Sequence, residues 1–195
     1  MIKKKTVFGP QINPYLKQIG ELRIQVFREF PYLYDGSEEY EQEYLQKYID
    51  SDESIAALIF DDDRLVGAST GIPLQDEGDD FKKPFIEQNH DLEDIFYCGE
   101  SILLPDYRGL GFYKYFFSER EHHARTLGRF NLITFCSVVR EKDHPLQPEN
   151  YAPLDPIWNR YGYQKQSHLK AQFPWKDVNQ EMKTNKEMVF WTKEI

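Results

Sequence analysis

The segment Ile102-Leu103-Leu104-Pro105-Asp106-Tyr107-Arg108-Gly109-Leu110-Gly111-Phe112-Tyr113 decides the fold that we expect for this chain. Its apolar run ends at Pro105, which has no amide hydrogen with which to continue a strand ladder. Two glycines follow, and from Lys114 onward the apolar residues recur at helical spacing until Gly128, a helix stop. The segment therefore predicts a strand, a glycine loop and a helix, in that order.

The start of the predicted helix has the chemistry of an anion site. The first amides of a helix have no intrahelical acceptor, and the aligned peptide dipoles place partial positive charge there. Gly109 and Gly111 allow a ligand to approach the backbone closely, and Arg108 adds a fixed charge. The third glycine of a dinucleotide fingerprint would fall at Lys114, and the Gly-Lys-Ser/Thr ending of a P-loop is absent, so neither nucleotide motif fits.

Two stretches resemble the signatures of the GNAT superfamily of N-acetyltransferases. Residues 105–111 resemble the pyrophosphate-binding motif of that family, which reads Arg/Gln-x-x-Gly-x-Gly or Arg-Gly-x-Gly after an apolar strand that ends in Pro. Residues 158–163 (Trp-Asn-Arg-Tyr-Gly-Tyr) resemble its second signature, an aromatic residue four positions before a Gly-aromatic pair. The chain departs from the family at Tyr113, where a small residue is common, and at Trp158, where a tyrosine usually acts as the acid.

The resemblance implies a fold, a donor and a reaction. The fold is one α/β domain over residues 1–195, with a mixed, mostly antiparallel sheet flanked by helices on both faces. The reaction transfers the acetyl group of acetyl-CoA to a primary amine of a small-molecule or peptide acceptor, by direct attack on the thioester. The implied acetyl-CoA ligands are Ile102, Leu103, Leu104, Arg108, Gly109, Leu110, Gly111, Phe112, Tyr113 and Trp158.

Glu100 is the candidate general base. It is a carboxylate within an otherwise apolar strand, where burial would raise its pKa toward the useful range. Pairing of Glu100 with an arginine, or capping of a bulge by Glu100, is the structural alternative. Asp143 and His144, in a proline-rich loop, are secondary candidates.

The candidate acid is displaced from its usual place in the family. Trp158 has no proton to donate at a useful pKa, so the role moves to Tyr151, Tyr161 or Tyr163, or to water, and we select Tyr161. In the GNAT fold the first two helices and their connection form one wall of the acceptor cleft, and on this chain that connection contains Tyr32 and Tyr34.

Composition limits the classes of function. The 195 residues suit one domain, the 40% hydrophobic content argues against disorder, and a net charge of −9 disfavours nucleic-acid partners. No apolar run is long enough to span a bilayer and no secretion signal is present, so we expect a cytoplasmic protein without membrane contact. Cys98 and Cys136 lack metal-ligand spacing, and we expect no metal.

Between Asp35 and Asp63 the chain has eleven acidic residues and a single basic one, Lys47. This acidic stretch is interpreted either as a solvated face or as an attraction for a cationic amine. The sequence leaves the acceptor and the oligomeric state open, a homodimer included.

Hydrophobic periodicity and turn residues divide the remainder of the chain into elements. We expect strands at residues 2–8, 55–60, 65–74, 130–139, 163–173 and 188–193, helices at 14–30, 38–48 and 157–161, and a long connection at 75–94 that overhangs the cleft.

The sequence leaves three functions open besides acetyl transfer. Because Trp158 replaces the usual tyrosine, the domain is alternatively a non-catalytic sensor of CoA or acyl-CoA. Residues 67–71 (Gly-Ala-Ser-Thr-Gly) match a hydrolase nucleophile elbow with Ser69 as nucleophile, but no helical pattern follows them. A non-enzymatic interaction protein is hinted at only by the acidic helix at residues 38–48.

Overall fold

The computed structural model describes residues 1–195. Its strands are β1 (Ile2–Phe8), β2 (Ile55–Asp61), β3 (Arg64–Pro73), β4 (Ile95–Tyr97), β5 (Ser101–Leu103), β6 (Leu132–Val138), β7 (Gln164–Trp175) and β8 (Thr184–Glu194). Its α-helices are α1 (Leu16–Phe27), α2 (Glu38–Asp50), α3 (Asp79–Glu87), α4 (Phe112–Leu127) and α5 (Asp155–Arg160). Four 3₁₀ segments lie between them: η1 (Gly9–Tyr15), η2 (Leu74–Asp76), η3 (Leu92–Asp94) and η4 (Pro105–Tyr107).

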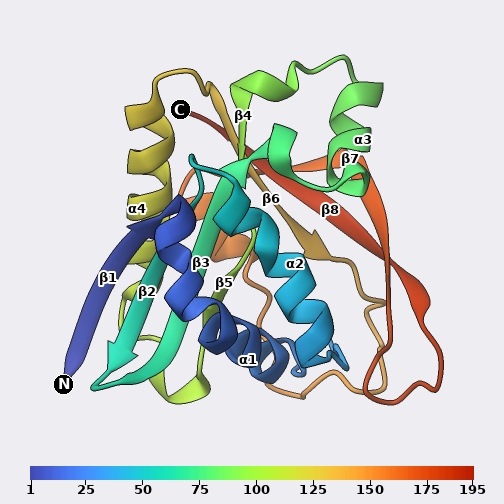
Figure 1. Cartoon of the computed structure of the whole chain (residues 1–195). Helices are drawn as coiled ribbons and strands as arrows, with labels where there is room; N and C mark the ends of the chain where they lie inside the picture. The colour runs from blue at the N-terminus through green and yellow to red at the C-terminus, as the bar shows by residue number, and fades with distance from the viewer.

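The strands form one sheet in the order β1-β2-β3-β4-β6-β8-β7, with β5 paired to β3 (Figure 1). Every pairing is antiparallel except that of β4 with β6. The expected mixed, mostly antiparallel sheet is confirmed.

Side chains alternate between the two faces along each strand, and on β4 this alternation assigns neighbouring residues to two different apolar clusters. Ile95 and Tyr97 of β4 belong to the larger cluster, which also holds Ile19 and Leu22 of α1. Phe96 and Cys98 belong to the smaller cluster, with Phe117 and Ala124 of α4 among its members. Figure 1 shows α1 and α2 in front of the sheet and α4 behind it, near β1 and β2. Helices therefore cover both faces, as expected.

The helix expected at residues 14–30 is shorter than the apolar pattern suggested. Pro10 and Pro14 have no amide hydrogen, and the residues around them form η1, so α1 begins only at Leu16. α1 ends at Phe27 because the chain must leave the helical conformation before Pro31. The long connection at residues 75–94 contains α3, which begins after Gly78.

None of the helices is both long and apolar enough to cross a bilayer. No three His, Cys, Asp or Glu side chains gather where they would hold a metal ion.

Candidate functional site

The two central strands part in the middle of the sheet. β4 pairs in parallel with β6 from Ile95↔Leu132 to Tyr97↔Thr134, and the Cys98 amide still donates to the Thr134 carbonyl at 2.7 Å. Beyond that point β5 pairs only with β3, whereas the rest of β6 pairs only with β8. The chain between β4 and β5 (residues 98–100) thus marks the place where two neighbouring strands diverge.

The glycine loop presents a row of free backbone amides at the start of α4. The amides of Gly109, Leu110, Gly111, Phe112 and Tyr113 donate to no other backbone group, and the first such bond in the helix runs from Lys114 to Gly111. Gly109 and Gly111 have φ values of +76° and +82°, a conformation that strongly favours glycine. A Cβ at either position would have no heavy atom within 4 Å. The loop therefore leaves room for a ligand at both glycines, and with its free amides it has the geometry of an anion cradle.

The side chains around the glycine loop differ in their burial and in their contacts. Arg108 donates from Nε to the Leu103 carbonyl at 3.1 Å and forms a surface ion pair with Glu29 at 2.8 Å. Leu110 is 62% exposed, whereas the ring of Phe112 is buried, so that only the Phe112 amide is available to a ligand. The Tyr113 hydroxyl reaches toward the Ser101 carbonyl, 3.5 Å away, and therefore leans over β5.

The second signature begins on α5 and continues past its end at Arg160, on the face that α4 covers. Trp158 packs edge-on against Phe135 and Trp191, with ring centroids 5.1 and 4.9 Å away. Tyr161 stacks on Phe117 of α4 with centroids 4.2 Å apart. Tyr163 is fully buried, and its hydroxyl donates to Glu121.

Glu100 belongs to a buried ionic network. Its Oε2 accepts from Arg23, and Arg23 also donates through Nε to Glu41. The Tyr34 hydroxyl donates to the other oxygen of Glu41 at 2.9 Å. Burial raises the pKa of Glu100 even though Arg23 opposes the shift. The second carboxylate oxygen of Glu100, Oε1, is buried without a hydrogen-bond partner, as is the hydroxyl of Thr70, which also lowers the pKa of Glu100.

Ser69 does not form a nucleophile elbow. It lies in the middle of β3, fully buried, and its hydroxyl donates to the Glu100 carbonyl at 2.8 Å. An elbow requires a sharp strand-to-helix turn that exposes the serine, and β3 instead runs on to Pro73.

A cavity of about 410 Å³ opens between the first two helices, α3 and the last strands. Aromatic side chains are the largest group among its lining residues. The α1–α2 region contributes Phe27, Tyr32, Tyr34, Tyr40 and Tyr44. Phe81 comes from α3, Tyr97 from β4, and Phe173 and Trp175 from β7. Gly99 also lines the cavity, which therefore reaches the point where β4 and β6 part.

The structure brings some of the sequence-predicted residues to this cavity and leaves others away from it. Tyr32 and Tyr34 line it, whereas Glu100 touches it only through Arg23. Tyr161 and His144 are not among its lining residues. His144 lies in an exposed loop, where its Nδ1 accepts from the Leu146 amide at 3.2 Å.

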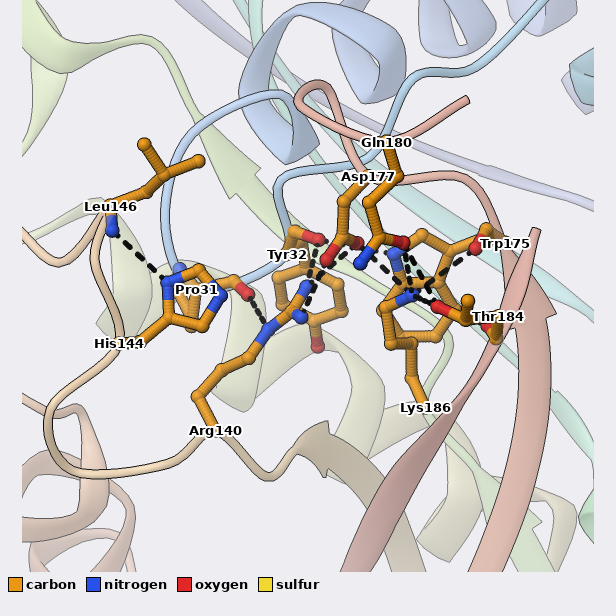
Figure 2. Close-up of polar contacts among 10 residues, drawn as sticks. All are labelled: Pro31, Tyr32, Arg140, His144, Leu146, Trp175, Asp177, Gln180, Thr184 and Lys186. Atoms are coloured by element: carbon orange, nitrogen blue, oxygen red, sulfur yellow. Dashed lines mark hydrogen bonds and ion pairs between the residues drawn. The ribbon is translucent and has the colours of Figure 1, made fainter. Parts of the chain in front are cut away.

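A second buried ionic cluster holds one wall of the cavity in place (Figure 2). Arg140, just after β6, donates to the carbonyls of Pro31 and Tyr32, both at 2.6 Å. It also binds both carboxylate oxygens of Asp177, at 2.8 and 3.0 Å. Asp177 lies in the connection between β7 and β8, and Lys186 of β8 approaches it to 3.3 Å. This Arg140–Asp177–Lys186 cluster thus ties the α1–α2 loop to the β7–β8 connection.

Sequence reasoning missed Arg23, Arg140 and Asp177. Arg23 carried a signal, because it is a charged residue next to Leu22 on the helix that was expected to face the sheet. A charge in such a position requires a buried partner. Arg140 and Asp177 carried no comparable signal, since each stands in a polar stretch of the sequence.

No protein-family profile matches the chain, and no curated protein matches its sequence. Solved structures do match in fold. NAA60 of Arabidopsis thaliana, in complex with acetyl-CoA, aligns with a TM-score of 0.64 at 11% identity, over 100% of this chain and 99% of its own. A ribosomal-protein-alanine N-acetyltransferase from Brucella melitensis gives 0.62 at 11% identity, over 100% and 99%. An acetyltransferase of the GNAT family from Streptococcus pneumoniae gives 0.60 at 11% identity, over 100% of both chains. The parted central strands and these full-length likenesses show that the chain has the fold of the GNAT N-acetyltransferases.

Proposed function

We propose that this protein is an acetyl-CoA-dependent N-acetyltransferase whose acceptor is a primary amine. One observation carries the proposal: five consecutive free amides at the start of α4 lie beside two strands that part in mid-sheet. Five free backbone donors at a helix N-terminus suit the pyrophosphate of a CoA thioester. Two structural neighbours, NAA60 of Arabidopsis thaliana and yncA of Salmonella typhimurium, are complexes with acetyl-CoA.

The residues proposed to bind the donor divide into three groups. The backbone of Gly109 to Tyr113 and the guanidinium of Arg108 would hold the pyrophosphate, for which Arg108 would have to exchange its surface partner Glu29. The edge of Ile102 to Leu104 that turns away from β3 would accompany the pantetheine arm. Trp158 would support this region from the α4-covered face, where it packs against Phe135.

Glu100 is proposed as the general base. The amine nitrogen attacks the thioester carbon, the carbon–sulfur bond breaks, and the amine must lose a proton. Glu100 Oε1 accepts that proton directly or through one water, and the raised pKa brings the carboxylate closer to the pH at which such a base works. Arg23 pairs with Oε2 and opposes the rise of the Glu100 pKa, which favours the ionised carboxylate.

Tyr161 is proposed to protonate the departing thiolate. It stands on the α4-covered face, opposite the aromatic cavity, so the donor and the acceptor would approach from different sides of the sheet. The cysteines are not used, because burial raises the pKa of Cys98 to about 11 and that of Cys136 to about 12.

The test of the cradle compares two glycines at opposite ends of α4. Gly111 and Gly128 have nearly the same positive φ, +82° and +75°, so alanine strains the backbone equally at both positions. Only Gly111 belongs to the row of free amides. We expect Gly111→Ala to weaken acetyl-CoA binding at least about 10-fold in calorimetry because a methyl group stands where the pyrophosphate approaches. Gly128→Ala should bind as the wild type does.

The binding and CoA-release measurements distinguish an acetyltransferase from a CoA sensor and from a chain without a CoA site. Equal losses in both variants, or no binding of acetyl-CoA by the wild type, would remove the basis of the proposal. Binding that Gly111→Ala abolishes, without release of free CoA in the presence of any amine, would identify the chain as a CoA sensor instead.

A further inference from the structure

We infer that the acceptor is a small primary amine carried on an aromatic body by a short aliphatic chain. The inference rests on the proposed acetyltransferase function and assigns the aromatic cavity as the acceptor site. The cavity, about 410 Å³, suits a small molecule rather than a folded chain, since small-molecule sites span about 300–1,000 Å³.

The walls of the cavity present ring faces and ring edges to an occupant. Phe81 and Phe173 contact each other with centroids 4.4 Å apart, and Phe81 also meets Tyr97 at 5.0 Å. The ring of Tyr32 stacks on the ring of Trp175, and the Arg140–Asp177–Lys186 cluster holds the loop of Tyr32 in place through the Tyr32 carbonyl. Aromatic rings prefer such offset and edge-on partners, so a further ring completes the set better than a saturated chain does.

Few charges of the cavity are free to receive a polycation. The lining cations Arg23 and Lys47 and the acid Asp79 are already held in ion pairs. Asp80 is the lining acid that forms no ion pair. A polyamine or an aminoglycoside would bring several positive charges to this single carboxylate.

The position of Gly99 directs the amine end of the acceptor. Gly99 lines the cavity at the point where β4 ends, and a Cβ there would stand 2.0 Å from the Tyr48 hydroxyl, so the residue must be glycine. Glu100 follows immediately, and Arg23, its ion-pair partner, also lines the cavity. An aromatic body among the rings therefore places a short amine chain toward the proposed base.

The first experiment is an acceptor panel with acetyl-CoA and the full chain, read as release of free CoA. The panel holds phenethylamine, tryptamine, cyclohexylethylamine, spermidine, kanamycin and a tetrapeptide that begins with alanine. We expect kcat/KM for phenethylamine or tryptamine to exceed that for spermidine, kanamycin and the peptide by at least about 10-fold. Cyclohexylethylamine, which keeps the size of the ring and loses its aromatic faces, should fall between the two groups.

The second experiment tests whether the cavity is the acceptor site. Phe81→Ala removes a ring from the cavity wall, whereas Ile86→Ala removes an exposed side chain from the same helix α3. We expect Phe81→Ala to raise KM for phenethylamine about 10-fold and to leave acetyl-CoA binding unchanged. Ile86→Ala should match the wild type in both measurements.

The outcomes separate this inference from the proposed function. Efficient acetylation of spermidine, kanamycin or the peptide in preference to both arylalkylamines would overturn the inference and leave the acetyltransferase function standing. So would an unchanged KM in Phe81→Ala that folds and binds acetyl-CoA normally. If acetyl-CoA does not bind at all, the proposed function fails before the acceptor question is reached.

Discussion

At the scale of single residues, Glu100 and Glu41 share one guanidinium, that of Arg23. All three side chains are nearly inaccessible to solvent, and two carboxylates against one cation leave an excess of negative charge. Burial therefore raises the pKa of Glu100 above its usual value near 4.5. A carboxylate that keeps an unpartnered oxygen in such surroundings is suited to take up a proton.

Glu100→Gln tests this role. As a base Glu100 must be ionised, so kcat/KM of the wild type should fall as the pH drops below the raised pKa. The glutamine variant should lose about 100-fold or more in kcat, show no such fall of kcat/KM at acidic pH and bind acetyl-CoA normally. Glu121→Gln, which alters a second buried carboxyl, is the control and should keep both the rate and the fall of kcat/KM at acidic pH.

The same ionisation affects stability with a definite sign. Because the folded state holds the proton on Glu100 more tightly than the unfolded state, its contribution is present at low pH and is lost as the pH rises above about 4.5, through the folded pKa. Glu100→Gln should remove this part of the pH dependence in denaturation experiments. An unchanged turnover number in the variant would assign Glu100 a purely structural pairing with Arg23.

At the scale of elements, the connection between β7 and β8 is docked onto the loop after α1. The Val178 amide donates to the Leu33 carbonyl at 2.7 Å, and the Asp35 amide donates to the Lys176 carbonyl at 2.9 Å. Asp177 lies between these two hydrogen bonds and forms ion pairs with Arg140 and Lys186 (Figure 2). Two segments far apart in the sequence thus form one rigid wall of the cavity.

Asp177→Asn should loosen that wall. Removal of one member of a buried charge cluster leaves Arg140 without its bidentate partner and should cost about 3–5 kcal/mol of unfolding free energy. We expect KM for the amine to rise several-fold and the Kd of acetyl-CoA to stay unchanged, because no member of the cluster contacts the glycine loop directly. Glu187→Gln, which breaks an exposed pair with Lys170 on the same hairpin, should cost at most about 1 kcal/mol.

The pH dependence of this cluster is opposite to that of Glu100. Although burial works against it, contact with Arg140 and Lys186 lowers the pKa of Asp177 below 3.8. Its stabilisation is therefore present above pH 3.8 and is lost as the pH falls through the lower folded value. An Asp177→Asn variant as stable as the wild type at pH 7 would show that the backbone hydrogen bonds alone hold the wall.

At the scale of the whole molecule, the acidic stretch between Asp35 and Asp63 does not converge on the cavity. Asp35 pairs with Arg28 and Lys176, Asp61 and Asp62 bind the amino terminus, and Glu53 pairs with Arg129. Of these acids only Glu41 contacts a lining residue, through Arg23 and Tyr34. The structure thus favours paired and solvated acids over a surface that collects cationic substrates.

Binding of acetyl-CoA should stabilise the folded chain as a whole. A ligand present at 100 times its Kd adds about 2.7 kcal/mol to the unfolding free energy. For a domain of this size that corresponds to a rise in Tm of about 5–11 °C, measurable in a thermal-shift titration. Free CoA shares the pyrophosphate and should give a shift of similar size. A shift with neither compound would contradict the site at the glycine loop.

Local chemistry made much of the fold predictable. Pro105 ends a strand because it has no amide hydrogen, and Gly111 and Gly128 bound α4 because each adopts a left-handed conformation. The period of the apolar residues indicated the strands of both hairpins within a few positions. The break at residues 98–100 was not predictable in the same way, because its meaning depends on which strands pair on either side of it.

The sequence by itself determined the order of strand, glycine loop and helix, and with it the anion cradle, because each of these features depends on neighbouring residues. Only the tertiary structure decided that Arg23 reaches Glu100 and that the rings of α1, α2, α3 and β7 enclose one cavity. Those contacts join residues up to 143 positions apart, as Tyr32 and Trp175 are, and they exist only once the sheet has set the order of its strands. Long-range packing, which no local pattern encodes, therefore forms the cavity that we propose as the acceptor site.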